Sequence, residues 1–264
     1  MTSSDAAQLL GVSPASVKRW ADSGLLPCVK TAGSHRRFRR HEVEAFRQNG
    51  ASPAPPGAAR GWLAGWLDTL LRDANPLAVA HLLLVERARL GAWWRVADAL
   101  DPVLVELGRR WQAGEIATVD EHEASERFTR GVARCAEMLS APSAAPHALL
   151  ASADGDDHTL GLRLVELCLR DRGINVDWAG APTPTSAVVE RLARGRVSIV
   201  ALSASVASSD ARDLARQARL LATACRKHGA DLILGGRGAW PERPSHGLRM
   251  TSFAELESYL RRWD

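Results

Sequence analysis

A stretch rich in proline, glycine and alanine divides the chain near its N-terminus. Residues 49–60 read Asn-Gly-Ala-Ser-Pro-Ala-Pro-Pro-Gly-Ala-Ala-Arg. Such a composition cannot bury a core and favours extended conformations. With 264 residues, the chain is long enough for more than one compact domain. We therefore expect a small domain over residues 1–50, a linker over residues 51–60 and the larger folded part beyond it.

The excess positive charge lies entirely within the predicted small domain. Residues 1–50 contain eight Lys and Arg residues and four Asp and Glu residues, which accounts for the whole net charge of +4. A concentrated positive charge attracts a polyanion and releases its counterions. Charge alone leaves open a basic face that is merely solvated.

The order of motifs in residues 1–50 resembles the MerR- and excisionase-type winged helix-turn-helix. Two short helices flank a turn at Gly11, Gly24 follows the second, and residues 31–38 form a basic hairpin with Gly33 at its tip. The resemblance implies binding to double-stranded operator DNA through a recognition helix and a wing. The residues expected to contact DNA are Ser16, Lys18, Arg19, His35, Arg36 and Arg37. His35 has the alternative role of stiffening the wing.

Residues 61–141 have a strong helical periodicity with few interruptions. Asn75-Pro76 separates the first two helices, Asp101-Pro102 starts or bends another, and Gly114 ends it. A last helix is expected to begin at Thr118 or Asp120. Four helices with short connections predict a four-helix bundle.

Residues 146–264 alternate between short apolar runs and amphipathic segments. The alternation predicts a parallel sheet with helices on both faces, a flavodoxin-like or Rossmann-like domain whose ligands bind beyond the carboxyl ends of the strands. The chain as a whole is thus expected to be multidomain, α and α/β. The expected strands are 148–152, 174–178, 197–203 and 231–235, and the expected helices are 160–172, 186–194, 210–228 and 253–263.

Three motifs fall at the ends of successive predicted strands. Asp156, His158 and Gly161 form D-x-H-x-x-G after the first strand, Ser203 ends the third, and Gly235-Gly236 ends the fourth. This pattern resembles the cobalamin-binding motif of methionine synthase, corrinoid mutases and the CarH/LitR-type photoreceptors. Considered alone, a histidine in a loop before a helix is a common feature without a ligand.

The resemblance implies a role for each of these residues. His158 becomes the lower axial ligand of cobalt, and Asp156 holds the imidazole through its other nitrogen. Gly161 lets the loop approach the corrin closely, Ser203 contacts the displaced benzimidazole tail, and Gly235 and Gly236 make room for that tail. Ser205 is also expected at this site, although many members have an apolar residue or threonine at its position.

A second motif lies in the predicted bundle. Trp111, Glu121 and His122 form W-x9-E-H, which resembles the helical cap of the CarH/LitR-type proteins. The resemblance implies that Trp111 covers the upper face of the corrin and that Glu121 and His122 hold the adenosyl group. The alternative is that Trp111 is a core residue of the bundle, since the chain has nine tryptophans, and that Glu121 and His122 are only the exposed start of a helix.

The residue after Trp111 departs from the family pattern. Light sensors of this type have a histidine there, which takes the upper cobalt position after light breaks the cobalt–carbon bond, whereas this chain has Gln112. An amide is a poorer cobalt ligand than imidazole. Either His122 takes that position, or water does, or light is not the signal.

The cysteines and the apolar segments indicate the compartment. The four cysteines form no C-x-x-C motif and are expected to be reduced and mostly buried, without a zinc site. No uncharged apolar run reaches the length of a membrane span, and the first residues lack a signal-peptide pattern. The expected location is the cytoplasm, without a membrane partner.

The resemblance covers nearly the whole chain and implies a transcriptional regulator, a repressor that uses adenosylcobalamin as a light-sensing cofactor and is not an enzyme. In that family the dark, adenosyl-bound form is a tetramer on operator DNA. Three alternatives stay open: a corrinoid carrier of a methyltransferase system, a cobalamin-sensing regulator that does not respond to light, and a cofactor-free regulator that binds another protein through the same domain.

Overall fold

The computed structural model describes most of the chain as two compact units. These are Met1–Trp62 and Leu63–Asp264, and each is described by itself. The described residues are 1–10, 14, 17–18, 21, 26, 28–31, 36–49, 56–73, 75, 77–139, 141–208 and 210–263.

The described residues of the first unit form helical segments and a small antiparallel hairpin. Helix α1 spans Ser3–Leu10 and α3 spans Arg40–Asn49. Strands β1 (Val29–Lys30) and β2 (Arg36–Arg37) pair, with Lys30 opposite Arg36, so the two strands of the predicted wing are confirmed. The tip of the wing and most of the second predicted helix lie outside the described residues. The buried side chains include Ala6, Val17, Leu26, Phe38 and Val43.

Four helices occupy the middle of the chain: α4 (Pro56–Arg72), α5 (Ala78–Leu90), α6 (Trp93–Gln112) and α7 (Thr118–Glu137). One boundary differs from the sequence-based expectation. Helix α4 begins at Pro56, inside the expected extended linker, since a proline fits the first turn of a helix. Of the two expectations for Asp101-Pro102, that it starts a helix is wrong, because Pro102 lies inside α6. None of the described helices has the length and apolarity to cross a membrane.

Close packing holds the helices of this middle region together. Gly131 on α7 lies so near α5 that a Cβ there would come within 2.5 Å of the Val79 side chain. The Arg127 guanidinium donates to the Leu70 carbonyl at the end of α4, 2.8 Å away. The helical bundle predicted for this region is therefore present, with a core that includes Trp66, Leu70, Leu83, Leu100 and Phe128.

The rest of the second unit is a five-stranded parallel sheet of order β4-β3-β5-β6-β7. All four predicted strands and four predicted helices are present, and β7 is an additional two-residue strand that the apolar pattern did not reveal. The strands are β3 (His147–Ser152), β4 (Asn175–Trp178), β5 (Ile199–Ala204), β6 (Asp231–Gly236) and β7 (Leu248–Arg249), and the helices are α8 (Leu160–Asp171), α9 (Thr185–Ala193), α10 (Ala211–His228) and α11 (Phe253–Leu260).

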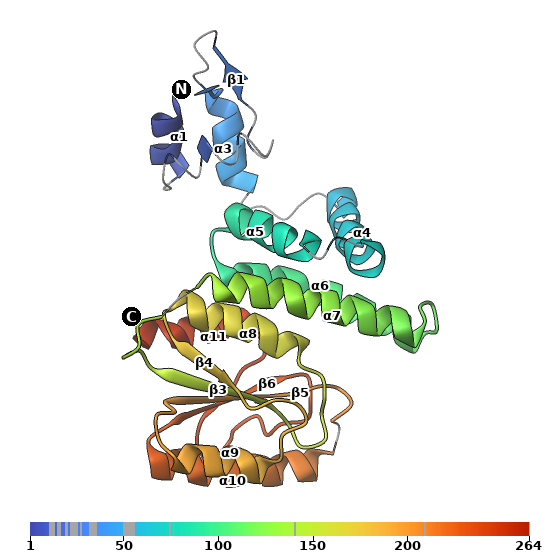
Figure 1. Ribbon diagram of the computed structural model, residues 1–264, viewed down its shortest axis with the longest axis vertical. Coiled ribbons are helices and arrows are strands. Elements are labelled where there is room, and N and C mark those ends of the chain that lie inside the picture. Colours follow the sequence, from blue (N-terminus) through green and yellow to red (C-terminus); the bar gives the residue numbers. More distant parts are fainter. Residues whose placement is uncertain are drawn as a thin grey trace. The chain divides into compact units, whose positions relative to one another are not determined.

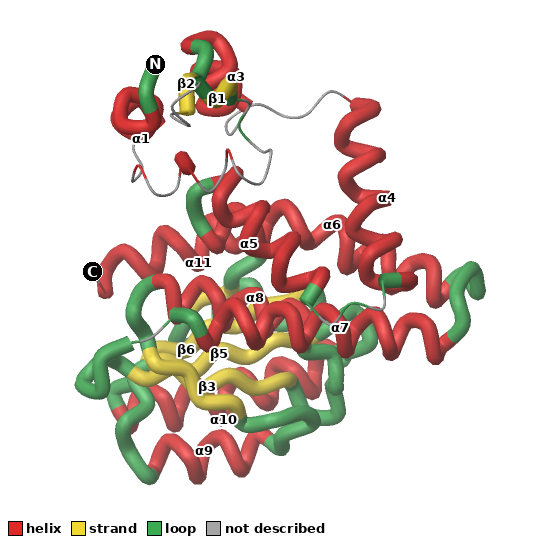
Figure 2. The backbone as a smooth tube through the Cα atoms, turned by 45° about the horizontal axis from the view of Figure 1, so that its top comes forward, coloured by secondary structure: helices red, strands yellow, loops and turns green. Residues whose placement is uncertain are grey.

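Helices cover both faces of this sheet (Figure 1). Helices α9 and α10 lie on one face, over a core that includes Leu149, Val200, Leu202, Leu221 and Leu232. Helices α8 and α11 lie on the other face, and α6 and α7 pack outside them as a further layer, as Figure 2 also shows. The carboxyl ends of the parallel strands meet at one edge, where this topology places ligands.

The cysteines agree with the expectation of reduced thiols. All four are unpaired; Cys28 is half-buried and Cys135, Cys168 and Cys225 are buried. Burial raises the pKa of the Cys135 and Cys225 thiols to about 12, so both stay protonated at neutral pH.

Candidate functional site

Two loops meet at the carboxyl edge of the sheet, one after β3 and one after β5. The Asp156 carboxylate is buried between them and joins them. It accepts hydrogen bonds from the backbone N–H of His158 (3.0 Å), from the backbone N–H of Ser205 (2.6 Å) and from the hydroxyl of Ser208 (2.7 Å). Asp156 therefore fixes both loops through one side chain.

These hydrogen bonds determine the charge of Asp156. Burial acts to raise the pKa of its carboxyl, but the bonds from Ser205, Ser208 and His158 outweigh burial, and the net effect lowers the pKa below the ordinary value. The group is consequently an anion at neutral pH. An anionic carboxylate only accepts hydrogen bonds, so each neighbour must donate.

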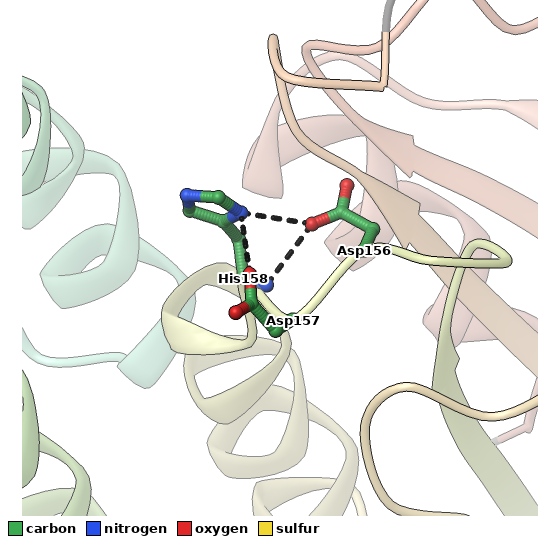
Figure 3. Close-up of side chains that lie close together, drawn as sticks. All are labelled: Asp156, Asp157 and His158. Atoms are coloured by element: carbon green, nitrogen blue, oxygen red, sulfur yellow. Dashed lines mark hydrogen bonds and ion pairs between the residues drawn. The ribbon is translucent and has the colours of Figure 1, made fainter.

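His158 is oriented by this anion. Its Nδ1 lies 2.9 Å from the nearer Asp156 oxygen and 3.2 Å from an oxygen of Asp157, while Nε2 points away from both carboxylates (Figure 3). The Ser205 hydroxyl is 3.3 Å from the same Nδ1. Since the carboxylates can only accept, Nδ1 carries a proton, and in the neutral imidazole the lone pair is then on Nε2. The imidazole side chain is 55% exposed, so that lone pair is available to a metal.

Asp156, Asp157 and His158 also form a cluster whose potential metal-ligating atoms lie within 4.8 Å of one another. The oxygens of Asp156 are already engaged by three donors, and Nδ1 of His158 is engaged by Asp156. A cation held by all three residues would have to displace those hydrogen bonds. The arrangement instead fits one imidazole nitrogen, Nε2, offered to a metal that carries its other ligands with it.

A cavity of about 150 Å³ opens at the same edge, between the ends of β5 and β6 and the helices α8 and α11. We call it the slot. Gly161, Ser203, Gly235 and Gly236 all line it, so the structure brings together the residues of the three sequence motifs.

The glycines keep the slot open. A Cβ at Gly236, whose φ is +80°, would overlap the Ala204 carbonyl oxygen and come within 2.6 Å of the Ser203 hydroxyl. A Cβ at Gly161 would meet no atom within 4 Å and would project into free space. Gly236 is thus required by backbone packing, whereas the absence of a side chain at Gly161 leaves room for a ligand.

Sequence reasoning missed several residues that support this edge. Ser208 completes the hydrogen bonds of Asp156, and the indole N–H of Trp240 donates to the Gly235 carbonyl at 3.0 Å. The buried Gln217 on α10 accepts from the backbone N–H of Asp154 at 3.0 Å. The W-x9-E-H and D-x-H-x-x-G patterns contain none of these positions, and only the fold brings them to the site.

The second sequence motif lies where α6 ends and α7 begins. Trp111 is 39% exposed and its indole N–H donates to the Thr118 hydroxyl at 3.2 Å, so the alternative that it is a core residue is wrong. Glu121 accepts from the Ser125 hydroxyl at 2.6 Å and lies 3.9 Å from the exposed His122. Within the described part of the chain, no hydrogen bond or ion pair joins these residues to the His158 loop.

The residues expected to contact DNA are described only in part. Lys18 is helical and exposed, Arg37 on β2 is exposed, and Arg36 on the same strand is half-buried. Ser16, Arg19 and His35 lie outside the described residues.

Known protein families match three segments of the chain. A helix-turn-helix domain matches residues 1–51, and B12 binding domains match residues 90–136 and 146–243. The first match contains the hairpin, the second contains Trp111, and the third contains His158 and the slot glycines. The chain accordingly consists of a helix-turn-helix domain followed by cobalamin-binding domains.

Three curated proteins are similar to the chain. The HTH-type transcriptional repressor CarH of Myxococcus xanthus is 29% identical over 245 residues, 79% of each chain. CarA of the same organism, also an HTH-type transcriptional repressor, is 34% identical over 102 residues, 39% of this chain and 34% of CarA. The transcriptional repressor DcmR of Methylorubrum extorquens is 53% identical over 53 residues, 19% of this chain and 20% of DcmR. The chain thus matches only a fifth of DcmR and a third of CarA.

A solved structure agrees with the fold. The monomethylamine corrinoid protein of Methanosarcina barkeri superposes with a TM-score of 0.54 at 18% identity, covering 74% of this chain and 94% of that protein. The likeness supports the helical layer and the parallel sheet as one architecture.

Proposed function

This chain has the CarH-type order of a helix-turn-helix domain followed by B12 binding domains, and from that premise we propose that it is a transcriptional repressor that uses adenosylcobalamin as its sensory cofactor. The observation that carries the proposal is His158, an exposed imidazole whose Nδ1 is held by the buried anion Asp156 and whose Nε2 is available to a metal. We assign it no catalytic activity of its own, and we place it in the cytoplasm with its DNA.

The residues at the sheet edge fit the cofactor. His158 would bind cobalt from below, and Asp156 with Ser205 and Ser208 would hold the ring in position. Gly161, Ser203, Gly235 and Gly236 would accommodate the nucleotide tail in the slot. The open space at Gly161 and the side-chain-free strand ends support this assignment.

The upper face is assigned to the helical layer. Trp111 would cover the corrin, and Glu121 and His122 would hold the adenosyl group by hydrogen bonds. When bound, adenosylcobalamin supplies a cobalt–carbon bond that light can break. The partial exposure of Trp111 supports this role, because an indole of the bundle core could not contact a ligand.

Control of DNA binding would follow from linkage. Contacts of the adenosyl group with Trp111 and Glu121 favour one arrangement of α6 and α7, and loss of those contacts removes the bias. We propose that the adenosyl-bound form is a tetramer and that illumination dissociates it. Several helix-turn-helix domains on one operator bind more tightly than one, so dissociation would release the DNA.

DNA contacts are assigned to the first unit. Ser16, Lys18 and Arg19 would face the major groove, and His35, Arg36 and Arg37 would contact phosphates or the minor groove. The exposure of Lys18 and Arg37 supports this assignment.

A second candidate is a regulator that senses cobalamin without light. Gln112 favours it, because an amide after Trp111 is a poor replacement for an imidazole at cobalt. The two candidates share the cofactor site and differ only in the response to illumination.

One experiment tests both candidates. The protein is loaded with adenosylcobalamin in the dark, and its absorption spectrum, oligomeric mass and affinity for DNA selected from a random duplex pool are followed before and after illumination. The proposal expects a coloured tetramer that dissociates in light and releases DNA. A coloured protein whose oligomeric mass and DNA affinity do not change on illumination supports the second candidate. A protein that stays colourless contradicts both candidates.

A further inference from the structure

The slot has one basic and one acidic lining residue in the described part of the chain. Arg237 directly follows Gly236 at the end of β6, and Asp101 lies on α6. The Arg237 guanidinium donates to the Asp101 carboxylate at 2.6 Å. This ion pair therefore connects the helical layer to the strand end that borders the slot.

The lining of the slot changes character with depth. Its buried residues are apolar and include Leu162, Leu202, Ile233 and Leu256. The exposed lining residues are polar or lack a side chain: Gly161, Gly236, Arg237, Thr251 and Ser252. A ligand that matches this gradient has an apolar part that enters the slot and an anionic group at its outer end that faces Arg237.

Arg237 can readily exchange Asp101 for another partner. The two side chains are 48% and 54% exposed, and ion pairs exposed to this degree contribute little to stability. A second contact would keep α6 attached if the pair opened, because the Asp98 carboxylate accepts from the backbone N–H of Phe253 at the start of α11, at 3.0 Å. Arg237 can thus change partners without release of the helix.

We infer that Arg237 binds the phosphate of the cobalamin nucleotide tail and that Asp101 occupies Arg237 until the tail enters the slot. The tail has the two parts that the slot selects, an aromatic base and a phosphodiester. A guanidinium binds phosphate oxygens with charge-assisted hydrogen bonds. Arg237 is thereby a specificity residue for corrinoids with a complete tail. The inference rests on the proposed function.

The test compares two cofactors on the full chain. Adenosylcobinamide has the corrin ring and the adenosyl group but neither the nucleotide base nor its phosphate. Affinities for adenosylcobalamin and adenosylcobinamide are measured in the dark by absorption titration for the wild type, Arg237→Ala, Asp101→Asn and the control Arg216→Ala. Arg216 makes an exposed ion pair with Asp213 at 2.8 Å on α10 and does not line the slot.

Arg237→Ala is expected to weaken adenosylcobalamin binding about five- to tenfold and to leave adenosylcobinamide binding within about twofold. Asp101→Asn removes the competitor of the phosphate and is expected to tighten adenosylcobalamin binding about two- to threefold. Arg216→Ala is expected to change neither affinity.

Equal losses for both cofactors in Arg237→Ala, or no loss for either, would overturn the role of Arg237. Weaker adenosylcobalamin binding in Asp101→Asn would overturn the exchange, because it would mean that the Asp101–Arg237 pair persists in the loaded protein. A wild type that binds neither cofactor contradicts the proposed function itself, an outcome distinct from the other two.

Discussion

The two parts of the candidate cofactor site differ in the burial and the hydrogen bonding of their side chains. Around His158, one buried carboxylate accepts hydrogen bonds from two loops and fixes the ring before any ligand is present. Around Trp111, the indole is 39% exposed and Glu121 is half-buried, and their hydrogen bonds are local, from Trp111 to Thr118 and from Ser125 to Glu121. On the proposed function, the lower part would anchor the cofactor, while the upper part would be free to respond to its state.

The largest effect on stability and on cofactor ligation is expected from a change at Asp156. Asp156→Asn keeps the shape of the side chain but removes its negative charge. The groups of His158, Ser205 and Ser208 that donate to the carboxylate would then face an amide N–H₂ or a neutral carbonyl. We expect a loss of about 3 kcal/mol in the free energy of unfolding and loss of histidine ligation. Urea unfolding and the absorption spectrum of the loaded protein measure both effects. The matched control is Asp157→Asn, whose side chain is 81% exposed and whose effect should stay within about 0.5 kcal/mol. Equal effects of the two variants would contradict the account.

A smaller effect is expected from the glycines of the slot. Gly236→Ala places a methyl group against the Ala204 carbonyl in a left-handed backbone conformation and should destabilise the protein by about 2 kcal/mol. Gly161→Ala has free space and should leave stability nearly unchanged while weakening adenosylcobalamin binding. Thermal unfolding and cofactor titration of both variants separate backbone packing from ligand space. An unchanged affinity in Gly161→Ala would remove that residue from the cofactor site.

The pH dependence of the free energy of unfolding tests whether Asp156 is an anion in the folded protein. The folded-state pKa of Asp156 is depressed, so its contribution is fully present above the unfolded-state value of about 3.9 and is lost as the pH falls through the lower folded-state value. The difference in urea midpoint between wild type and Asp156→Asn should be constant from pH 7 to about pH 5 and shrink below about pH 4. A difference that grows as the pH falls would mean that the carboxyl is not an anion in the folded protein.

A small change in stability is expected at Trp111. Because the side chain is partly exposed, Trp111→Ala should cost less than about 1 kcal/mol of folding free energy, while adenosylcobalamin binds about tenfold more weakly and hydroxocobalamin is unaffected. Trp93→Ala on the same helix is the contrast, since that residue is buried and its loss should cost about 3–5 kcal/mol. Similar stability losses in the two variants would mean that Trp111 also belongs to the core.

Sequence predicted most of the sheet well, because strands β3, β5 and β6 are largely apolar runs bounded by turn residues. It failed where local pattern carries no signal. Strand β7 has only two residues, and Pro56 opens a helix from within a segment whose composition favours an extended chain. The whole DNA-contact prediction stays a prediction, and three of its six residues, Ser16, Arg19 and His35, also lie outside the described part of the chain.

The candidate site also contains residues that a sequence motif reveals and residues that it does not. Asp156, His158 and the slot glycines belong to motifs that resemble those of a known family, and this resemblance predicted them, while the structure places them at one edge of the sheet. Ser208 lies 52 residues beyond its partner Asp156, and Gln217 lies 63 residues beyond its partner Asp154. Only the pairing of β3 with β5 and the packing of α10 bring these two residues to the loop. Such partners are set by tertiary structure, which periodicity does not encode.

The most direct test of the central claim is electron paramagnetic resonance of the protein loaded with cob(II)alamin, whose unpaired electron couples to the axial nitrogen. With ¹⁴N protein the coupling splits each cobalt line into a triplet, and with ¹⁵N-labelled histidine it should become a doublet, because the ligand is Nε2 of His158. His158→Ala should abolish the effect of the label. A triplet that survives ¹⁵N-histidine labelling would show that the cofactor's own base stays on cobalt and would contradict the account.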